Sequence, residues 1–217
     1  MRRWLIRVLA AFLRVFFSWL YHQGAFAYNG VAAIVSVGLW RKWVLSVLPD
    51  LPGPRVLEVG HGPGHLQVAL KQAGMTAYGL DESRQMGHVA RRRLQRQGHS
   101  PALARGLAQS MPFPNETFDQ VVATFPSEYI TDPHTLGEIY RVLKPGGSAI
   151  LLPIAWITGR RLFERAAAWL FRFTGQAALD WWEDCLFVPV QQARFTTQVD
   201  KKVLGPSMLL TVKATKG

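Results

Sequence analysis

Apolar and polar positions along the chain follow two different periods, and the change from one to the other divides the sequence into strands and helices. Short apolar runs of strand character alternate with longer segments whose apolar residues recur every third or fourth position. The helical patterns cover residues 32–48, 64–73, 82–97, 132–142 and 159–173. The strand candidates cover residues 55–59, 76–80, 102–105, 118–124, 148–153, 194–199 and 208–213.

This alternation predicts an α/β fold. Strands that alternate with helices are joined by right-handed crossovers, which produce a parallel sheet covered by helices on both faces. The last two strand candidates are instead joined through Gly205 and Pro206, as expected if an antiparallel pair closes the sheet. We therefore expect a Rossmann-like, doubly wound, mostly parallel seven-stranded sheet with an antiparallel last strand. Residues 1–48 are expected to form an N-terminal helical extension, and residues 49–217 the α/β domain.

The segment 56–65 carries the strongest chemical signal. An apolar strand contains Glu58 near its carboxyl end and then opens into a loop with glycine at alternate positions, Gly60, Gly62 and Gly64. Glycines at this spacing let the backbone turn sharply and let a ligand lie against main chain where a Cβ would intrude. Taken alone, such a loop is equally compatible with an ordinary strand-to-helix turn.

A second acid, Asp81, favours a cofactor site over an ordinary turn. It follows the next strand, about twenty residues after the loop, where doubly wound nucleotide folds place an acid on the ribose hydroxyls. The nicotinamide fingerprint requires a further glycine at the sixth position of the motif. This chain has His65 there, so the loop departs from the dinucleotide pattern.

With Gly64 in the fifth place, the loop resembles that of the class I S-adenosylmethionine-dependent methyltransferases. Segments 108–114, 118–124 and 143–147 resemble the later motifs of that family in order and spacing. The likeness is to methyltransferase domains of type 11, and segment 28–43 further resembles the entry helices of ubiquinone and menaquinone biosynthesis methyltransferases. The resemblance implies S-adenosylmethionine as the cofactor.

The resemblance also implies which residues contact that cofactor. Glu58 would face the charged methionine end, and Asp81 the ribose diol. Many relatives have an aspartate where this chain has Leu107, so adenine would be held here by packing in place of that hydrogen bond. The expected cofactor-binding residues are Glu58, Gly60, His61, Gly62, Gly64, Asp81, Glu82, Ala108, Gln109 and Thr124.

Few catalytic side chains are required, because alignment alone supplies roughly 7 to 11 kcal/mol in an in-line displacement. A base is needed only where the acceptor must lose a proton. His61, Glu128 and His134 are candidates, and His61 is equally compatible with a residue that bonds the loop backbone. The family positions its acceptor after the fourth strand, which implies Phe125, Glu128 and Tyr129. The catalytic residues that we expect are His61, Glu128 and Tyr129.

The charge balance narrows the choice of partners. The 217 residues carry a formal net charge of +11, which favours anionic partners such as lipid headgroups or nucleic acid. The arginines 91–93 and Arg96 fall on helical segment 82–97, which favours a solvated helix face over a binding patch. Nucleic acid is disfavoured because Phe125-Pro126-Ser127 lacks the motif that amine- and base-methylating relatives carry. The single cysteine excludes an internal disulfide and a Cys-rich metal site, and we expect no metal.

The first twenty residues read as a basic amphipathic helix. Arg3, Arg7 and Arg14 lie on one narrow helical face, and aromatic and aliphatic residues cover the others. Such a helix suits an anionic membrane surface, where each basic charge contributes on the order of 1 kcal/mol. Arg7 and Arg14 interrupt the apolar run, which disfavours a transmembrane span and a signal peptide. Alternatively, the apolar face packs on the domain or on a second subunit.

Together these patterns predict a methyltransferase that acts on a small hydrophobic acceptor, a quinone precursor or a lipid. We expect it to be cytoplasmic and to dock peripherally on the inner face of the cell membrane through residues 1–20. A phospholipid amine or soluble small-molecule methyltransferase is the alternative enzyme. Leu107 and the lack of an obvious base also leave room for a noncatalytic, membrane-associated protein that binds S-adenosylmethionine. The sequence leaves the oligomeric state open.

Overall fold

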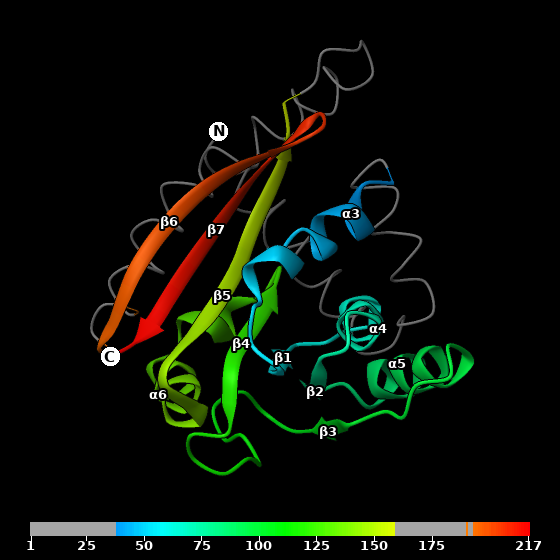
Figure 1. Ribbon diagram of the computed structural model, residues 1–217, viewed down its shortest axis with the longest axis horizontal. Coiled ribbons are helices and arrows are strands. Elements are labelled where there is room, and N and C mark those ends of the chain that lie inside the picture. The colour runs from blue at the N-terminus through cyan, green and yellow to red at the C-terminus, as the bar shows by residue number, and fades with distance from the viewer. Residues whose placement is uncertain (1–37, 159–189, 191–192) are drawn as a thin grey trace, which may run out of the picture.

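The computed structural model describes residues 38–158, 190 and 193–217 (Figure 1). The strands are β1 (Arg55–Val59), β2 (Thr76–Asp81), β3 (Leu103–Arg105), β4 (Phe118–Thr124), β5 (Leu143–Ile157), β6 (Phe195–Leu204) and β7 (Ser207–Lys216). The helices are α3 (Trp40–Leu45), α4 (His65–Gln72), α5 (Arg84–Arg96) and α6 (Pro133–Val142), with the 3₁₀ helices η1 (Leu48–Asp50) and η2 (Glu128–Thr131).

The strands form one seven-stranded sheet in the order β3-β2-β1-β4-β5-β7-β6. The pairs among β1 to β5 are parallel, whereas β7 runs antiparallel to β5 and to β6. The expected mostly parallel sheet with an antiparallel last strand is therefore confirmed. Because β1 lies at the centre with β2 and β4 beside it, the loop that follows β1 leaves the sheet between two neighbouring strand ends.

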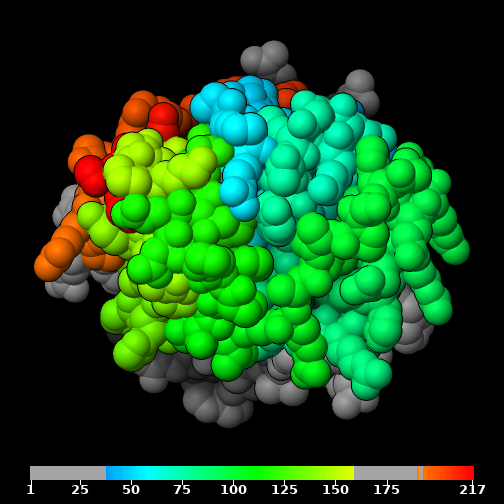
Figure 2. All heavy atoms as spheres, turned by 60° about the horizontal axis from the view of Figure 1, so that its bottom comes forward, coloured from blue at the N-terminus to red at the C-terminus, as the bar shows by residue number. Residues whose placement is uncertain are grey.

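Side chains of the central strands alternate between two cores. Val56 and Val122 pack with Trp43 and Leu66 of α3 and α4, whereas Leu57 and Val121 belong to the core on the opposite face. Figure 1 shows α3, α4 and α5 on one side of the sheet and α6 on the other. In Figure 2, α4 (teal) is flanked by the chain before β1 (blue to cyan) and by α5 (green). The sheet is thus covered on both faces, as a doubly wound fold requires.

Two helices begin where polar side chains cap them. The Ser83 side chain accepts from the backbone N–H of Met86 at the start of α5. The Asp132 side chain accepts from the N–H of His134 at the start of α6, which has proline at its first position. Such caps satisfy backbone donors that the first helical turn leaves open. They explain why both helices begin within two residues of the positions that the sequence predicts.

The helix predicted over residues 32–48 is wrong at both ends of its described part. The observed helix α3 begins at Trp40, after Gly38 with a φ of +78°, and ends at Leu45. Beyond it the Ser46 hydroxyl bonds the Trp43 carbonyl, and the 3₁₀ helix η1 follows. Residues 32–37, the predicted helix 159–173 and the amphipathic segment 1–20 lie outside the described residues.

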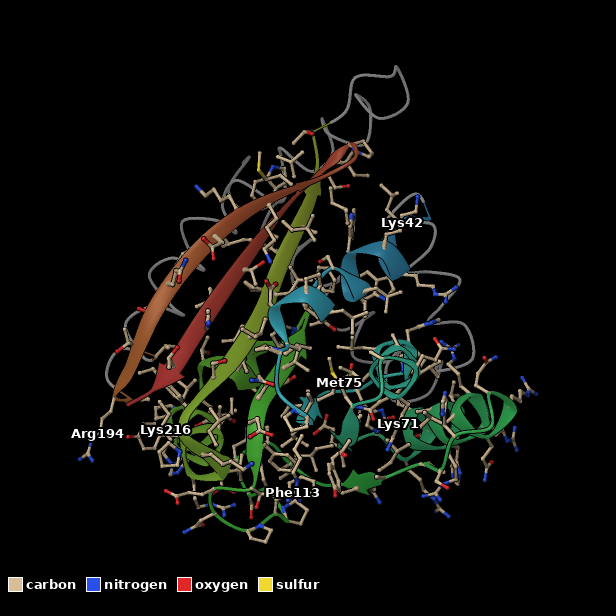
Figure 3. All side chains as sticks on the ribbon, in the orientation of Figure 1. Lys42, Lys71, Met75, Phe113, Arg194 and Lys216 are labelled. Carbon is tan, nitrogen blue, oxygen red and sulfur yellow. The ribbon has the colours of Figure 1, made fainter. Side chains whose placement is uncertain are left out.

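Aromatic contacts close the edge of the sheet where β1 to β5 begin. Phe113, which is labelled in Figure 3, lies in the connection between β3 and β4. Its ring packs edge-on against Phe118 with ring centroids 5.2 Å apart. At the end of β7, the Lys216 ammonium lies 4.7 Å from the ring centroid of Tyr140 and donates to the Leu143 carbonyl at 2.7 Å. These contacts lie at the amino ends of the parallel strands, and the loops that carry the predicted site residues leave from the carboxyl ends.

Candidate active site

The carboxyl ends of β1, β2 and β4 meet at one edge of the sheet. Glu58 of β1 is level with Gly79 of β2 and with Val122 of β4. The glycine loop after β1, the acid that ends β2 and the loop after β4 are consequently neighbours. This is the edge where open α/β sheets bind their ligands.

The glycine loop adopts a backbone that side chains disfavour. Gly60, Gly62 and Gly64 have φ values of +72°, +50° and +78°, in the left-handed region that glycine tolerates. A Cβ on Gly64 would lie 2.8 Å from the Ala90 Cβ of α5, so this glycine lets the two helices approach. A Cβ on Gly62 would meet nothing within 4 Å. The middle of the loop thus borders open space.

Asp81 is held rigidly beside this loop. Its Oδ2 accepts from the Gly62 N–H at 2.8 Å, and its Oδ1 accepts from the Ser83 N–H at 2.8 Å. The side chain is buried, with 3% of its residue surface exposed. The sequence predicted Asp81 at this place but not Ser83, which both orients Asp81 through its backbone and caps α5 through its hydroxyl. Its position two residues after the acid was the available signal.

Glu58 is also buried, on the face of the sheet that α4 covers. Its Oε2 accepts from Gln67 Nε2 at 2.9 Å, and the same nitrogen donates to the Tyr78 carbonyl at 3.0 Å. Burial raises the pKa of Glu58 to about 8, with the charge of Asp81 adding to that rise and the Gln67 bond opposing it. At neutral pH the carboxyl group is therefore mostly protonated. Sequence reasoning missed Gln67, although a polar side chain between the apolar positions Leu66 and Leu70 was a signal.

His61 is packed into the loop itself. Its Nδ1–H donates to the Gly62 carbonyl at 2.8 Å and lies 4.0 Å from Asp81 Oδ2. Its ring packs against Gly79, where a Cβ would lie 2.8 Å from the His61 Cδ2. Burial lowers the pKa of His61, although Asp81 opposes the shift, so the imidazole is neutral. These contacts favour a role in holding the loop, and the assignment of His61 as a base stays a prediction.

The loop after β4 brings the predicted acceptor residues toward the glycine loop. Tyr129 of η2 donates from Oη to the Val59 carbonyl at 3.3 Å, and that Oη would lie 2.6 Å from a Cβ on Gly60. Phe125 directly follows β4 with a φ of +50°, and its N–H donates to the Leu152 carbonyl at 2.7 Å. Thr124 ends β4 and is half-buried, whereas Glu128 is exposed. Tyr129 thus lies directly over the glycine loop.

The remaining predicted residues lie around this edge. Gln109 donates from Nε2 to Asp132 Oδ2 at 3.2 Å, next to the buried Ala108. Glu82 has an exposed side chain, and its carbonyl accepts from Arg105 Nε at 3.0 Å. Leu107, where many relatives have an aspartate, exposes 55% of its surface. His134 is exposed at the start of α6. Within the described part of the chain, no group of three or more His, Cys, Asp and Glu is arranged to hold a metal ion.

The residues at this edge fit a cofactor with a cationic end and a sugar diol. The backbone of Gly62 offers a surface without a Cβ, and Asp81 offers a fixed acceptor for hydroxyl groups. A positive charge beside Glu58 would lower its raised pKa and favour the carboxylate. The strand order and this site define a class I S-adenosylmethionine-dependent methyltransferase.

Comparisons with known proteins agree with this class. Residues 57–151 match the family model described as a methyltransferase domain. A demethylmenaquinone methyltransferase of Symbiobacterium thermophilum is 33% identical over 173 residues, which cover 75% of this chain and 67% of that protein. A ubiquinone/menaquinone biosynthesis C-methyltransferase of Cupriavidus taiwanensis is 33% identical over 140 residues, which cover 61% of this chain and 58% of that protein. The chain therefore spans between about half and two thirds of the length of such relatives.

Solved structures show the same fold at lower identity. A Thermotoga maritima methyltransferase, described as a possible histamine N-methyltransferase, has a TM-score of 0.60 and 20% identity, covering 92% of this chain and 100% of that one. Haemonchus contortus phosphoethanolamine N-methyltransferase 2, in complex with S-adenosylmethionine, has a TM-score of 0.62 and 19% identity, covering 92% of this chain and 59% of that one. The chain belongs to the S-adenosylmethionine-dependent methyltransferases of the methyltransferase domain family, and S-adenosylmethionine is its cofactor.

Proposed function

We propose that this protein transfers a methyl group to a small hydrophobic acceptor, such as a quinone precursor or a lipid, at a membrane surface. The relatives named above are called demethylmenaquinone and ubiquinone/menaquinone biosynthesis methyltransferases, which supports a quinone-type ring as the acceptor. This chain covers only part of those proteins. The aromatic character of the site supports the same kind of acceptor independently.

A stacked aromatic pair beside the site is the observation that carries this proposal. The Phe125 and Trp40 rings stack with centroids 4.3 Å apart and an interplanar angle of 30°. The ring of Trp43, which is also in α3, has its centroid 6.2 Å from that of Phe125. Phe125 follows the last residue of β4, so the pair lies at the edge where the cofactor loop is. Flat apolar walls of this kind suit a planar hydrophobic acceptor better than a charged amine.

The cofactor residues divide according to the charge that each offers. We infer that Asp81 accepts hydrogen bonds from the ribose diol, while Glu58 and the backbone of the glycine loop face the methionine end. Ala108 and Gln109 would lie along adenine, with exposed Leu107 contributing apolar contact in place of an acid. When bound, S-adenosylmethionine supplies an electrophilic methyl group on a sulfonium centre. The protein's part is then to hold that group and the acceptor in line.

The acceptor side of the site is formed by the loop after β4. Tyr129 lies over Gly60 and presents its phenol oxygen close to the end of β1, and exposed Glu128 precedes it. A quinol carbon becomes nucleophilic when a ring hydroxyl loses its proton, which requires a base within hydrogen-bond reach. We infer that Tyr129 positions the acceptor ring and that Glu128 or His61 receives the proton.

The membrane part of the proposal comes from the sequence. Residues 1–20 lie outside the described residues, and their basic amphipathic pattern supports docking on an anionic surface of the cytoplasmic face. Among the helices that the structure describes, none has the length and apolar character to cross a membrane. A membrane-embedded quinone precursor would reach a protein docked in this way without leaving the bilayer.

Methyl transfer into a lipid extract tests the proposal directly. Full-length protein is incubated with labelled S-adenosylmethionine and a host lipid extract, and the label entering the organic phase is counted. We expect organic-phase label that Asp81→Ala reduces by more than about tenfold, because a fixed charged acceptor of the ribose is lost. Asp200→Ala on the edge strand β6 removes an acid far along the sheet from the site and should retain the label. Label confined to the aqueous phase would point to a soluble acceptor. A protein that binds S-adenosylmethionine but transfers no label would contradict the proposed methyltransferase activity.

A further inference from the structure

The connection between β3 and β4 is hydrogen-bonded along helix α6. At the start of the helix, Gln109 donates from Nε2 to Asp132 Oδ2. Further along, the backbone N–H of Met111 donates to Glu138 Oε2 at 2.6 Å. The connection and the helix therefore run side by side in the same direction, and Figure 1 shows this part of the chain next to α6. Three side chains of α6 and its cap take part in this attachment, and the cofactor residues assigned above include neither Glu138 nor Arg141.

Arg141 makes most of these hydrogen bonds. Its Nε and Nη2 donate to the two carboxylate oxygens of Glu138, at 2.6 and 2.8 Å. Its Nη1 donates to the Phe113 carbonyl and to Asn115 Oδ1, both at 2.8 Å. Nη2 also donates to the Met111 carbonyl at 3.0 Å. A guanidinium group has five N–H donors, and each of them has an acceptor here. The planar group is thus fixed between its own helix and the connection.

A second ion pair of the same geometry lacks this attachment. The hydrogen bond from Arg141 holds the pKa of Glu138 below its ordinary value, so Glu138 is a carboxylate at neutral pH. Lys144 and Asp119 form a comparable pair, 2.7 Å long, with similar exposure of the two side chains. Asp119, however, also accepts from the N–H of Arg55, at the start of β1. The two pairs therefore differ in what they hold in place: the first holds the connection between β3 and β4, and the second holds strand ends.

The attachment lies directly beside the turn that the proposed function places along adenine. This turn covers residues 107–110 and is closed by a backbone hydrogen bond of 3.2 Å between its first and last residues. Before the turn, the Gly106 N–H donates to the Asp81 carbonyl at 3.2 Å. After it, both the N–H and the carbonyl of Met111 are bound by side chains of α6. The position of the turn relative to Asp81 therefore depends on the hold that α6 has on Met111.

We infer that Glu138 and Arg141 are positioning residues for the cofactor, which act through Met111 to hold the turn at residues 107–110 in the conformation that receives adenine. They act through the backbone of the connection and need no contact with the cofactor. The inference rests on the proposed placement of adenine along this turn. Without the ion pair the turn samples other conformations, and the affinity falls in proportion to the time that it spends in them.

Calorimetric titration of the full-length protein with S-adenosylhomocysteine tests the inference without a methyl acceptor. Arg141→Lys keeps the charge but offers three N–H donors in place of five. It should raise the Kd about tenfold, as for a turn that is receptive about a tenth of the time. 5′-Methylthioadenosine, which has the adenosine part but no amino-acid end, should lose affinity by the same factor. Asn115→Ala, at an exposed position, removes one bond to Arg141 and should raise both Kd values about twofold. This milder variant decides the question if Arg141→Lys fails to fold.

Lys144→Gln is the matched control, because it breaks the comparable ion pair with Asp119. In urea unfolding it should lower the stability as Arg141→Lys does, but the Kd for both ligands should stay at the wild-type value. A folded Arg141→Lys protein with the wild-type Kd, or an equal loss of affinity in Lys144→Gln, would overturn the inference. So would weaker binding of S-adenosylhomocysteine alone, because the effect would then lie at the amino-acid end. Transfer of label into the lipid extract is a separate readout, so its failure would remove the proposed acceptor and leave these Kd changes standing.

Discussion

Because we propose that Glu58 faces the methionine end of the cofactor, its ionisation should couple cofactor binding to pH. Its pKa of about 8 means that the free protein holds a proton at neutral pH, whereas the carboxylate is the form that attracts a cationic ligand. Binding at neutral pH must therefore release that proton. By linkage, the affinity rises with pH up to the pKa of the free protein and is level above it.

This coupling predicts the pH dependence of affinity. Between pH 6 and pH 8, the Kd for S-adenosylmethionine should fall by up to about tenfold per pH unit relative to Glu58→Gln. The comparison with Glu58→Gln is needed because the amine of the ligand titrates near pH 8 as well. Isothermal titration calorimetry in buffers of different ionisation enthalpy measures both the Kd and the protons released. A ratio of the two Kd values that stays constant from pH 6 to pH 8 would argue against Glu58 as the titrating group.

At the residue scale the sequence predicts the acids and glycines of the site but not their supports. Asp81 and the alternating glycines could be predicted because each directly follows or ends a strand pattern that is visible in the local sequence. The contact of Gln67 with Glu58 could not be predicted, because it depends on how α4 lies across β1 and β2. The orientation of His61 toward Gly79 likewise depends on a neighbouring strand, so sequence alone left two roles open for it.

Gly60 of the glycine loop faces Tyr129 of the 3₁₀ helix η2, which makes the contact between the two segments testable. Gly60→Ala places a Cβ in a left-handed backbone, at about 1 to 2 kcal/mol, and against the Tyr129 oxygen, at about 1 to 3 kcal/mol. Tyr129→Phe removes that oxygen and leaves the nearest ring carbon 3.5 Å away, an ordinary contact. In urea unfolding, Gly60→Ala should lower the free energy of unfolding less in the Tyr129→Phe background than in the wild type. The difference between the two effects should be about 1 kcal/mol or more.

Gly62→Ala is the matched control for this double mutant. It has the same left-handed backbone but no atom within 4 Å of the added Cβ. Its cost should be the backbone term alone, and it should be the same in both Tyr129 backgrounds. Additivity of Gly60→Ala and Tyr129→Phe would mean that η2 moves away from the loop in solution.

At the element scale, strands bounded by helices were predicted closely, and elements without such bounds were not. Strands β1 and β4 have the predicted limits because turns and helices stop them on both sides. Strands β5, β6 and β7 extend beyond their predicted limits because each pairs along a long neighbour, a contact that is distant in sequence. Helix α3 is short because Gly38 and Pro49 interrupt an apolar pattern that continues through them.

The stability of the whole molecule should depend on Glu58 in the opposite sense to its binding. The folded pKa lies above the unfolded value, so the folded state holds the extra proton and its stability is lost as pH rises toward 8. His61 and His65 have lowered folded pKa values, so their contributions are lost only as pH falls below about 6.5. Asp119 and Glu138, whose pKa values are lowered as well, act at still lower pH. Among these described groups, Glu58 therefore dominates the pH dependence of the free energy of unfolding above pH 6.5.

Denaturant unfolding of the cofactor-free protein checks this. Between pH 6.5 and pH 8, the free energy of unfolding should fall by about 2 kcal/mol, at about 1.4 kcal/mol per unit of pKa. Glu58→Gln should be nearly level over the same range. A wild-type protein whose stability is level or rises there would show that burial does not hold the proton on Glu58.

The direction of β7 determines where a label, a solid support or a fusion partner can be attached. Because β7 runs opposite to β5, it ends beside the start of β5, at the edge away from the glycine loop. Figure 1 shows the carboxyl terminus far from the β6–β7 turn, which leaves the sheet on the side of the cofactor loop. A resin, a fluorophore or a fused partner attached at the end of β7 would therefore lie away from the glycine loop, whereas an insertion at Gly205 would project on the same side of the sheet as that loop.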